Sequence, residues 1–417
     1  MLLVFLRKKE SMSTFSKFCC IATLTIFAFG LPNGRIALAF ELGVGDWQAH
    51  GFASQGYTYT SGNNFFGNSR HDGSFDFREI GINVAGHVYP NLLIAAQGLY
   101  RDAGGSDTDN FRLDFANLDY RYPINDESTI GIRLGRIKNP FGLYNDTRDV
   151  IWTRPGVTLP QSVYFDALAL RQAMIASDGG LIYGRHTFGD HGLSAEFVTA
   201  NPLDNTGGAT EFLTGFPTAP GRMTGRPLLI GRAGYQWKEG RFRLLFSIVD
   251  LNRDFRSSSS IVPSGNIKTL YPLASAQLNF EKWSFTAEYG QVITERSESL
   301  RTLIPLKNTS ESFYVQSEYR FAPAWTALLR FDAFFADIHD RSGKRLAQMT
   351  GLPKSNFLSR DITFGLRWTF AKNFMVAADY HRIHGTGWLS LADNPQLLQG
   401  AGDPNWDLVT VMFSYRF

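Results

Sequence analysis

Charged side chains recur two positions apart within several apolar stretches of the sequence. Arg112 and Asp114 form one such pair, and Arg330 and Asp332 form another. On an extended chain, residues two apart point to the same side, so each pair presents both charges on one face. Arginines set opposite carboxylates create a field across a gap, and such a field sorts ions and charged solutes. The chemistry that this spacing suggests is electrostatic selection, in which no bond is made or broken.

These charges form two groups. Strand parity puts on one inward face Arg112, Asp114, Arg133, Arg232, Arg243, Glu288, Glu318, Arg320, Arg330, Asp332, Arg367, Asp379 and His381. A second group lies on a long connection, residues 139–179, and comprises Asp146, Arg148, Asp149, Arg154, Asp166 and Arg171. The arginines of both groups, with Asp114, Asp146, Asp149 and Asp166, are the predicted lining of a pore and its constriction. The alternative is that the charges pair with one another and only keep the interior wet.

Patterns for metal binding and covalent catalysis are weak. His381 and His384 are three apart, which on a strand puts them on opposite faces. Asp107 and Asp109 lie in a glycine-rich stretch, but no EF-hand pattern surrounds them. The sequence contains no G-x-S-x-G motif and no P-loop. We therefore predict no catalytic residues, no metal and no cofactor.

The elements that must position the charges are extended runs in which apolar residues alternate with polar ones. In the last run, one face carries Val409, Val411, Phe413, Tyr415 and Phe417, and the other carries Thr410, Met412, Ser414 and Arg416. Most runs are about ten to thirteen residues long, the length that crosses a bilayer at a tilt. Sixteen runs are predicted: 46–60, 75–89, 91–101, 110–122, 129–138, 180–189, 192–199, 227–238, 241–252, 269–281, 283–294, 311–322, 324–336, 359–371, 373–384 and 405–417.

The connections between these runs alternate between short turns and long loops. Seven are short and eight are long, with both chain ends on the short-turn side. This is the plan of a transmembrane antiparallel β-barrel. Lipid cannot satisfy an open sheet edge, so a spanning sheet must close on itself. Aromatic residues near the strand ends would form girdles at the membrane interfaces; examples are Trp47, Tyr89, Tyr100, Tyr122, Trp283 and Trp406.

The first 39 residues have the pattern of a signal peptide. Basic residues open the chain, an apolar stretch follows, and Ala37-Leu38-Ala39 supplies a cleavage pattern. The predicted organisation is a signal peptide at 1–39 and one barrel at 40–417, with Met1 or Met12 as the start. Both cysteines lie in the first part, so the mature chain has no disulfide.

The charge balance excludes a nucleic-acid partner. The whole chain carries a net charge of +3. Five of its 41 basic and one of its 38 acidic residues lie in the first 39 positions, which leaves about −1. No field large enough to bind nucleic acid results. Outer-membrane lipid is the expected surrounding.

The terminal Phe417, preceded by Tyr415 and Phe413, resembles the C-terminal signature of Gram-negative barrel proteins. The segment Gly135–Tyr144, which reads GRIKNPFGLY, resembles that of uncharacterised porins near the phosphate-selective porin family. The resemblance implies a homotrimer in the bacterial outer membrane. It implies a passive channel for small hydrophilic solutes or ions, and a loop after the fifth strand that folds into the lumen and narrows it. The small arginine excess predicts a weak preference for anions.

Three other functions remain alternatives. An outer-membrane hydrolase needs a Ser–His pair on the outer wall, and the sequence spacing suggests none. An energised receptor needs a large N-terminal plug, whereas strands are predicted within about ten residues of Ala39. A structural or adhesive barrel is disfavoured only weakly.

Overall fold

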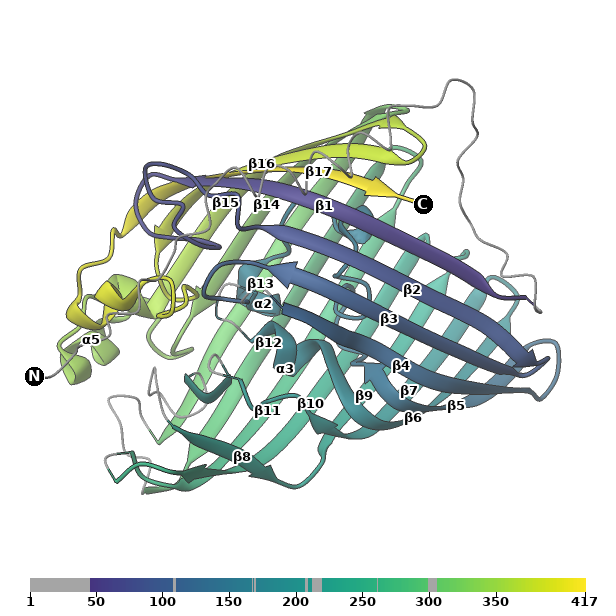
Figure 1. The fold of residues 1–417 in the computed structure, drawn as a ribbon, viewed down its shortest axis with the longest axis horizontal. Helices are drawn as coiled ribbons and strands as arrows, with labels where there is room; N and C mark the ends of the chain where they lie inside the picture. The colour runs from purple at the N-terminus through teal and green to yellow at the C-terminus, as the bar shows by residue number, and fades with distance from the viewer. Residues whose placement is uncertain are drawn as a thin grey trace, which may run out of the picture. The chain divides into compact units, whose positions relative to one another are not determined.

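The computed structural model describes residues 46–107, 110–166, 168, 170–206, 209–211, 220–260, 262–298 and 306–417. The predicted signal peptide at 1–39 lies outside the described residues and stays a prediction. The described part forms one continuous antiparallel sheet that closes on itself (Figure 1).

The sheet contains seventeen strands among the described residues. They are β1 (Gln48–Thr60), β2 (Arg78–Tyr89), β3 (Leu92–Asp102), β4 (Asn110–Pro123), β5 (Ser128–Lys138), β6 (Ala176–Phe188), β7 (His191–Pro202), β8 (Gly221–Gly225), β9 (Leu228–Trp237), β10 (Phe242–Ser257), β11 (Gly265–Asn279), β12 (Trp283–Arg296), β13 (Lys307–Ala322), β14 (Trp325–Phe335), β15 (Leu358–Ala371), β16 (Phe374–Gly385) and β17 (Asn405–Arg416).

These segments make sixteen crossings, because β8 and β9 are two parts of one. Only two residues separate β8 from β9, and both pair with β10, one with its far end and one with its near end. β1 pairs with β17 and closes the barrel. The predicted sixteen-stranded barrel is confirmed, and each predicted run overlaps one crossing. The largest boundary error is at the crossing formed by β8 and β9, which begins six residues before the predicted 227.

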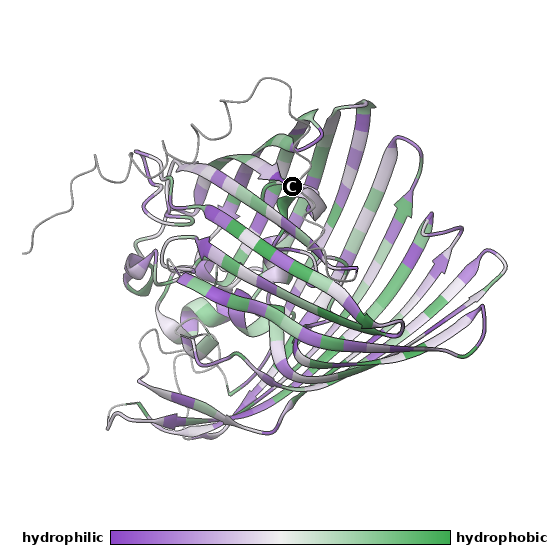
Figure 2. Cartoon of the chain, turned by 45° about the vertical axis from the view of Figure 1, so that its right-hand side comes forward, coloured by the Kyte–Doolittle hydropathy of each residue, from purple (hydrophilic) through white to green (hydrophobic). Residues whose placement is uncertain are grey.

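Hydrophobic and hydrophilic residues alternate along the strands (Figure 2), and many of the exposed residues are large and apolar. On β15, Ile362, Phe364 and Leu366 are exposed, whereas Asp361 and Thr363 between them are buried. A charge on such a face would cost about 2–4 kcal/mol at the bilayer midplane, so the apolar face meets lipid and the polar face lines the interior.

Aromatic side chains follow the short-turn rim, as predicted, with one exception. Trp283 stacks on Phe285 and Tyr319, and Trp325 stacks on Trp368. The prediction for Trp406 was wrong. This side chain is fully buried, packs on Trp388, and donates a hydrogen bond to the Gly385 carbonyl. Its position on the inward face of β17 overrides its closeness to a strand end.

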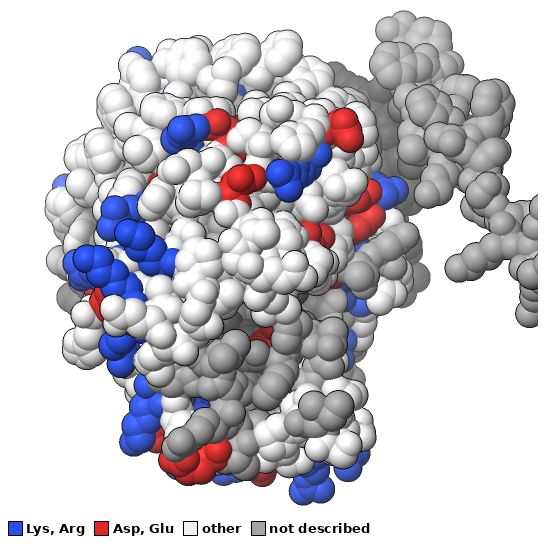
Figure 3. Space-filling view, turned by 90° about the vertical axis from the view of Figure 1, so that its left-hand side faces the viewer, with Lys and Arg blue, Asp and Glu red and all other residues white. Residues whose placement is uncertain are grey.

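The long connections gather at one end of the barrel and carry short helices. They include α5 (Lys344–Thr350), η3 (Lys354–Phe357) and η4 (Pro395–Gln399). Figure 3 looks onto this end, where acidic and basic side chains are interspersed. No helix among the described residues is both long and apolar enough to span a membrane.

Candidate functional site

The connection between β5 and β6 lies inside the barrel, where it is enclosed by the strands (Figure 1). We call residues 139–175 the inserted segment. It contains η1 (Ile151–Thr153), α2 (Gln161–Tyr164) and α3 (Arg171–Ile175). Gly142 starts the inward turn with φ of 59°, and an added Cβ would come within 2.7 Å of the Tyr164 hydroxyl. Only glycine fits this approach without strain.

Three wall carboxylates hold the backbone of the inserted segment. Glu288 on β12 accepts a hydrogen bond from the Leu143 amide at 3.0 Å. Asp379 on β16 accepts the Val157 amide at 2.7 Å. Asp332 on β14 accepts the Ser162 amide at 3.2 Å.

All three carboxylates are buried. We call Glu288, Asp332 and Asp379 the backbone-anchored side of the segment. Two wall arginines make hydrogen bonds in the reverse direction, from the wall to the segment. Arg330 donates to the Thr158 carbonyl at 3.0 Å, and Arg367 donates to the Arg154 carbonyl. Buried charges are tolerated when such bonds satisfy them, so this arrangement fixes the segment on the wall.

Apolar contacts fill the space between these anchors. Phe141 packs on Tyr271 of β11, and Phe165 packs edge-on against Phe334 of β14. Together with Tyr164 and Val163 they belong to one large buried cluster that spans the segment and the wall. Fully burying one such side chain is worth about 1.5–3 kcal/mol, so the segment is a packed part of the core.

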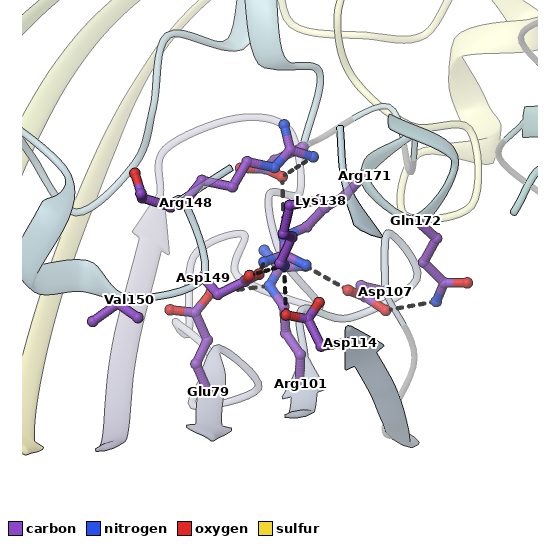
Figure 4. A network of polar contacts seen from close by, with 12 residues as sticks. Glu79, Arg101, Asp107, Asp114, Lys138, Arg148, Asp149, Val150, Arg171 and Gln172 are labelled. Atoms are coloured by element: carbon purple, nitrogen blue, oxygen red, sulfur yellow. Dashed lines mark hydrogen bonds and ion pairs between the residues drawn. The ribbon is translucent and has the colours of Figure 1, made fainter. Parts of the chain in front are cut away.

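The other side of the segment is held by ion pairs (Figure 4). We call this network the ion-pair side. Its members are Glu79, Arg101, Asp107, Arg112, Asp114, Lys138, Arg148, Asp149, Arg154, Asp166 and Arg171. It contains six cations and five anions, so it is almost neutral.

Two carboxylates connect the network to the wall. Glu79 on β2 forms an ion pair with Arg101 at 3.0 Å and a second one with Arg154 of the segment. Asp149 of the segment pairs with Lys138 at the end of β5 and with Arg171 of α3. All six side chains are at least nine-tenths buried.

The electrostatics keep Asp149 and Asp107 ionised. Burial opposes ionisation of Asp149, but Lys138 and Arg171 outweigh it and lower its pKa below the usual value. In the same way, Arg101 and Arg112 overcome burial at Asp107, whose pKa is also lowered. Burial lowers the pKa of Arg148 to about 10, which still leaves it cationic at neutral pH.

The structure brings the predicted loop charges together, but it buries them. Arg148, Asp149, Arg154, Asp166 and Arg171 all lie in the ion-pair side. These five residues therefore follow the alternative given above, in which the charges pair with one another. Their part in a constriction stays a prediction.

Asp146 is different because it is partly exposed. It pairs with Arg232 of β9 at 3.1 Å, and Arg232 also pairs with Glu196 at 2.5 Å.

The predicted wall residues divide between paired and unpaired groups. Arg112 pairs with Asp107, Arg133 with Asp119, and Asp114 with Lys138. Four predicted arginines form no ion pair with any described residue; these are Arg243, Arg320, Arg330 and Arg367. Arg330 and Arg367 hold the inserted segment. Arg243 and Arg320 lie near the short turns, where Arg243 donates to Gln277 and Arg320 to the Glu281 carbonyl.

Two further arginines near the short turns were not among the predicted residues. Arg121 follows the inward Asp119 on β4, and Arg185 follows the inward Tyr183 on β6 and lies over its ring. Neither forms an ion pair with a described residue. With Arg243 and Arg320 they make a group of four that we call the arginine rim. Arg367 and Arg416 also lie inward in this half and form no ion pair with a described residue, but both contact the inserted segment and are not counted in the rim. The inward acid Glu318 accepts a hydrogen bond from Gln316 and forms no ion pair with a described residue.

Sequence reasoning also missed Glu79, Arg101 and Asp119. Glu79 alternates with the exposed Ile80 and Ile82, so parity could have found it. Asp119 could not be found in this way. A β-bulge leaves Asp114 as an extra residue between the positions opposite Gln97 and Gly98, and this reverses parity along the rest of β4.

No cluster of three or more metal-ligating side chains occurs in the described ranges. His381 hydrogen-bonds to Asp361 at 2.7 Å inside the wall and stands apart from His384, which bonds to Asn405.

No family model matches the chain, and no curated protein matches it. Solved structures do. The outer-membrane channel DcaP of Acinetobacter baumannii is 13% identical with a TM-score of 0.57, over 91% of this chain and 99% of that one. An anion-selective porin from Comamonas acidovorans is 12% identical, with a TM-score of 0.55 over 89% and 99%.

Salmonella typhi OmpF, in complex with daunomycin, is 14% identical, with a TM-score of 0.54 over 89% and 98%. At these identities the likeness is one of fold. The chain has the closed β-barrel architecture of these porins and channels.

Proposed function

We propose that this barrel is a porin, a passive diffusion channel for small hydrophilic solutes with a weak preference for anions. The sixteen-stranded closed wall with a polar interior supports the channel. The arginine rim supports the preference for anions over cations. Four inward arginines without ion pairs raise the local anion concentration at the short-turn half. Short turns of such barrels face the periplasm, so the preference arises on that side.

The decisive observation is that the paired charges are buried around the inserted segment, whereas the four arginines of the arginine rim lie near the short turns. The ion-pair side is nearly neutral and buried, so it contributes little field to the water. Arg121, Arg185, Arg243 and Arg320 are left to set the sign. Salt screens charges over about 8 Å at physiological ionic strength, so the preference fades in concentrated salt.

Reversal potentials in planar bilayers test this proposal. In a dilute salt gradient, the protein should pass anions slightly better than cations. Replacing Arg121, Arg185, Arg243 and Arg320 by Gln should remove the preference or reverse it. The matched control is Lys307→Gln, which removes an exposed cation at the long-loop rim. Clear cation selectivity of the unaltered protein, or absence of conductance, contradicts the proposal.

We also propose that the protein assembles as a homotrimer, and that the inserted segment narrows the pore. Its contacts with Glu288 of β12 and with Glu79 of β2, on opposite sides of the barrel, support the narrowing. A mass of one mature chain only, measured in mild detergent, would count against the trimer. Membership of the group near the phosphate-selective porins also stays a prediction.

A hydrolase is the second candidate, and one observation favours it. Ser128 Oγ lies 2.9 Å from His186 Nδ1 at the outer face of β5 and β6, a pair that the sequence spacing did not suggest. No described side chain hydrogen-bonds to the other ring nitrogen of His186, so nothing orients the ring as in a triad. Ester hydrolysis that is lost in Ser128→Ala would favour this alternative over a purely passive channel.

A further inference from the structure

A small cavity lies inside the barrel between the inserted segment and the wall. Its volume is about 100 Å³. Leu228 and Ile230 of β9 and Val249 of β10 form part of its wall side, and Phe141 and Met174 form part of its segment side. These wall residues lie toward the long-loop ends of their strands, so the cavity is in the extracellular half.

The chemistry of this lining departs from the rest of the interior. Inward positions of a water-filled barrel are polar as a rule. Here consecutive inward positions of β9 are Leu228 and Ile230, and both are buried. The segment covers this apolar patch with Phe141 but leaves part of the space unfilled. Dense packing leaves few voids larger than a water molecule, and apolar voids stay dry. A void of this composition therefore suits an apolar occupant.

One hydroxyl in the lining lacks a partner. Thr269 of β11 lines the cavity, is 8% exposed, and its Oγ1 makes no hydrogen bond to any described residue. Buried polar atoms are nearly always paired. The other polar groups in the lining are engaged: Asn139 donates to the Met174 carbonyl, and Asp204 binds Arg253 at 2.7 Å. The hydroxyl of Thr269 is thus available to a ligand.

We propose that this cavity binds one small apolar ring that carries a single hydroxyl, as in a phenol. The ring would lie against Val249, Ile230 and Phe141, and its hydroxyl would bond to Thr269 Oγ1. An apolar cavity of roughly 150 Å³ is known to bind benzene. The present volume is smaller, so a lining side chain must move, and Met174 has the flexibility to do so.

The effect of this cavity on solute passage rests on the proposed channel function. If the barrel passes solutes, those with a phenol-like group are retained in the extracellular half. Because the site includes the inserted segment, the occupant contacts the part that narrows the pore. Binding itself requires no current, so the two ideas are measured separately.

Titration calorimetry of phenol and toluene into the purified folded barrel, with detergent micelles alone as the blank, tests the site. The unaltered protein should bind both saturably and phenol more tightly. Thr269→Val should weaken phenol by about fivefold, the value of one hydrogen bond, and leave toluene unchanged. Val249→Phe should fill the cavity and abolish both. The matched control is Thr410→Val, which removes another buried, unpaired hydroxyl that does not line the cavity.

Absence of saturable binding to the unaltered protein overturns the inference, as does binding that survives in Val249→Phe. Equal loss of phenol and toluene in Thr269→Val overturns the role of the hydroxyl. If Val249→Phe does not fold, Val292→Met fills the same space more gently, and the same outcomes apply to it. Conductance with no phenol binding defeats this inference alone, and phenol binding with no conductance defeats the channel alone.

Discussion

The inserted segment is held in two different ways on its two sides. On the ion-pair side, side chains of the segment meet side chains of β2 to β5. On the backbone-anchored side, wall carboxylates of β12, β14 and β16 accept amide hydrogens of the segment. Backbone amides are present whatever the residue, so the second side depends on the path of the chain. The first side depends on the identity of each residue.

This difference has an energetic consequence. Removing one member of a buried ion pair leaves its partner charged and unsatisfied, which is far costlier than losing an exposed pair. On the ion-pair side, substitutions of segment residues should therefore strongly lower the free energy of unfolding. On the backbone-anchored side, substitutions of the wall carboxylates should lower it instead.

The largest effect is expected from Asp149→Asn. This change takes one carboxylate from each of two buried cations: Lys138 keeps Asp114, and Arg171 keeps Asp166. Breaking a buried pair costs about 3–5 kcal/mol, and the retained partners place the expected fall in the free energy of unfolding at the lower end, about 3 kcal/mol. Guanidinium unfolding in detergent measures it. The freed segment should also make single-channel currents larger or noisier. A loss below about 1 kcal/mol would remove the basis for the comparison.

Glu288→Gln probes the backbone-anchored side. Glu288 accepts from the Leu143 amide, from Tyr164 at 2.6 Å and from Tyr314 at 2.8 Å. The amide keeps one acceptor oxygen, so we expect a loss of about 1.5–3 kcal/mol, the value of a hydrogen bond to a charged group. The same unfolding measurement applies. An effect larger than that of Asp149→Asn would reverse the ranking of the two sides.

The pH dependence of the ion-pair side sharpens the comparison. The folded protein lowers the pKa of Asp107, Asp149 and Asp166 below that of the unfolded chain. Their contribution is therefore complete above the unfolded pKa of about 3.9 and is lost only as pH falls toward the lower folded values.

Titration of Asp107, Asp149 and Asp166 should therefore produce no difference in protease digestion of the segment between pH 7 and pH 5. In Asp149→Asn, whose remaining network is weaker, digestion should be faster at both values. Acid release of the segment in the unaltered protein near pH 5 would show that other groups control it.

The smallest effect is expected from Asp178→Asn. Asp178 pairs with Arg136 at 2.7 Å, with the same bond types as in the network, but both side chains are partly exposed. Exposed pairs are worth about 0–1 kcal/mol. This variant is the matched control for Asp149→Asn, and a comparable loss from the two would mean that burial does not set the difference.

The wall of the barrel was predictable because its physics is local. Alternation in β15 or β17 follows from lipid on one side and water on the other, and each strand shows it within a dozen residues. The bulge at Asp114 marks the limit. One extra residue reverses the parity, and nothing in the spacing of β4 announces it, so Asp119 was missed.

The pairing of charges was not predictable in the same way. Arg154 meets Glu79 across 75 positions of sequence, and only the path of the inserted segment brings them together. Parity gives the face on which a charge lies but not its partner. For the same reason, the arginine rim emerges only once the paired residues are known.

The closure of the barrel joins the first and the last of the described strands. Phe417 exchanges both backbone hydrogen bonds with Gly51, and β17 pairs with β1 along nine positions. Contacts of such sequence separation form slowly, because the loop between them must be ordered first. The last of the described strands is therefore also the one that completes the first. Until β17 pairs with β1, two unpaired strand edges stay open to aggregation, so the chain depends on being kept apart from its neighbours while it folds.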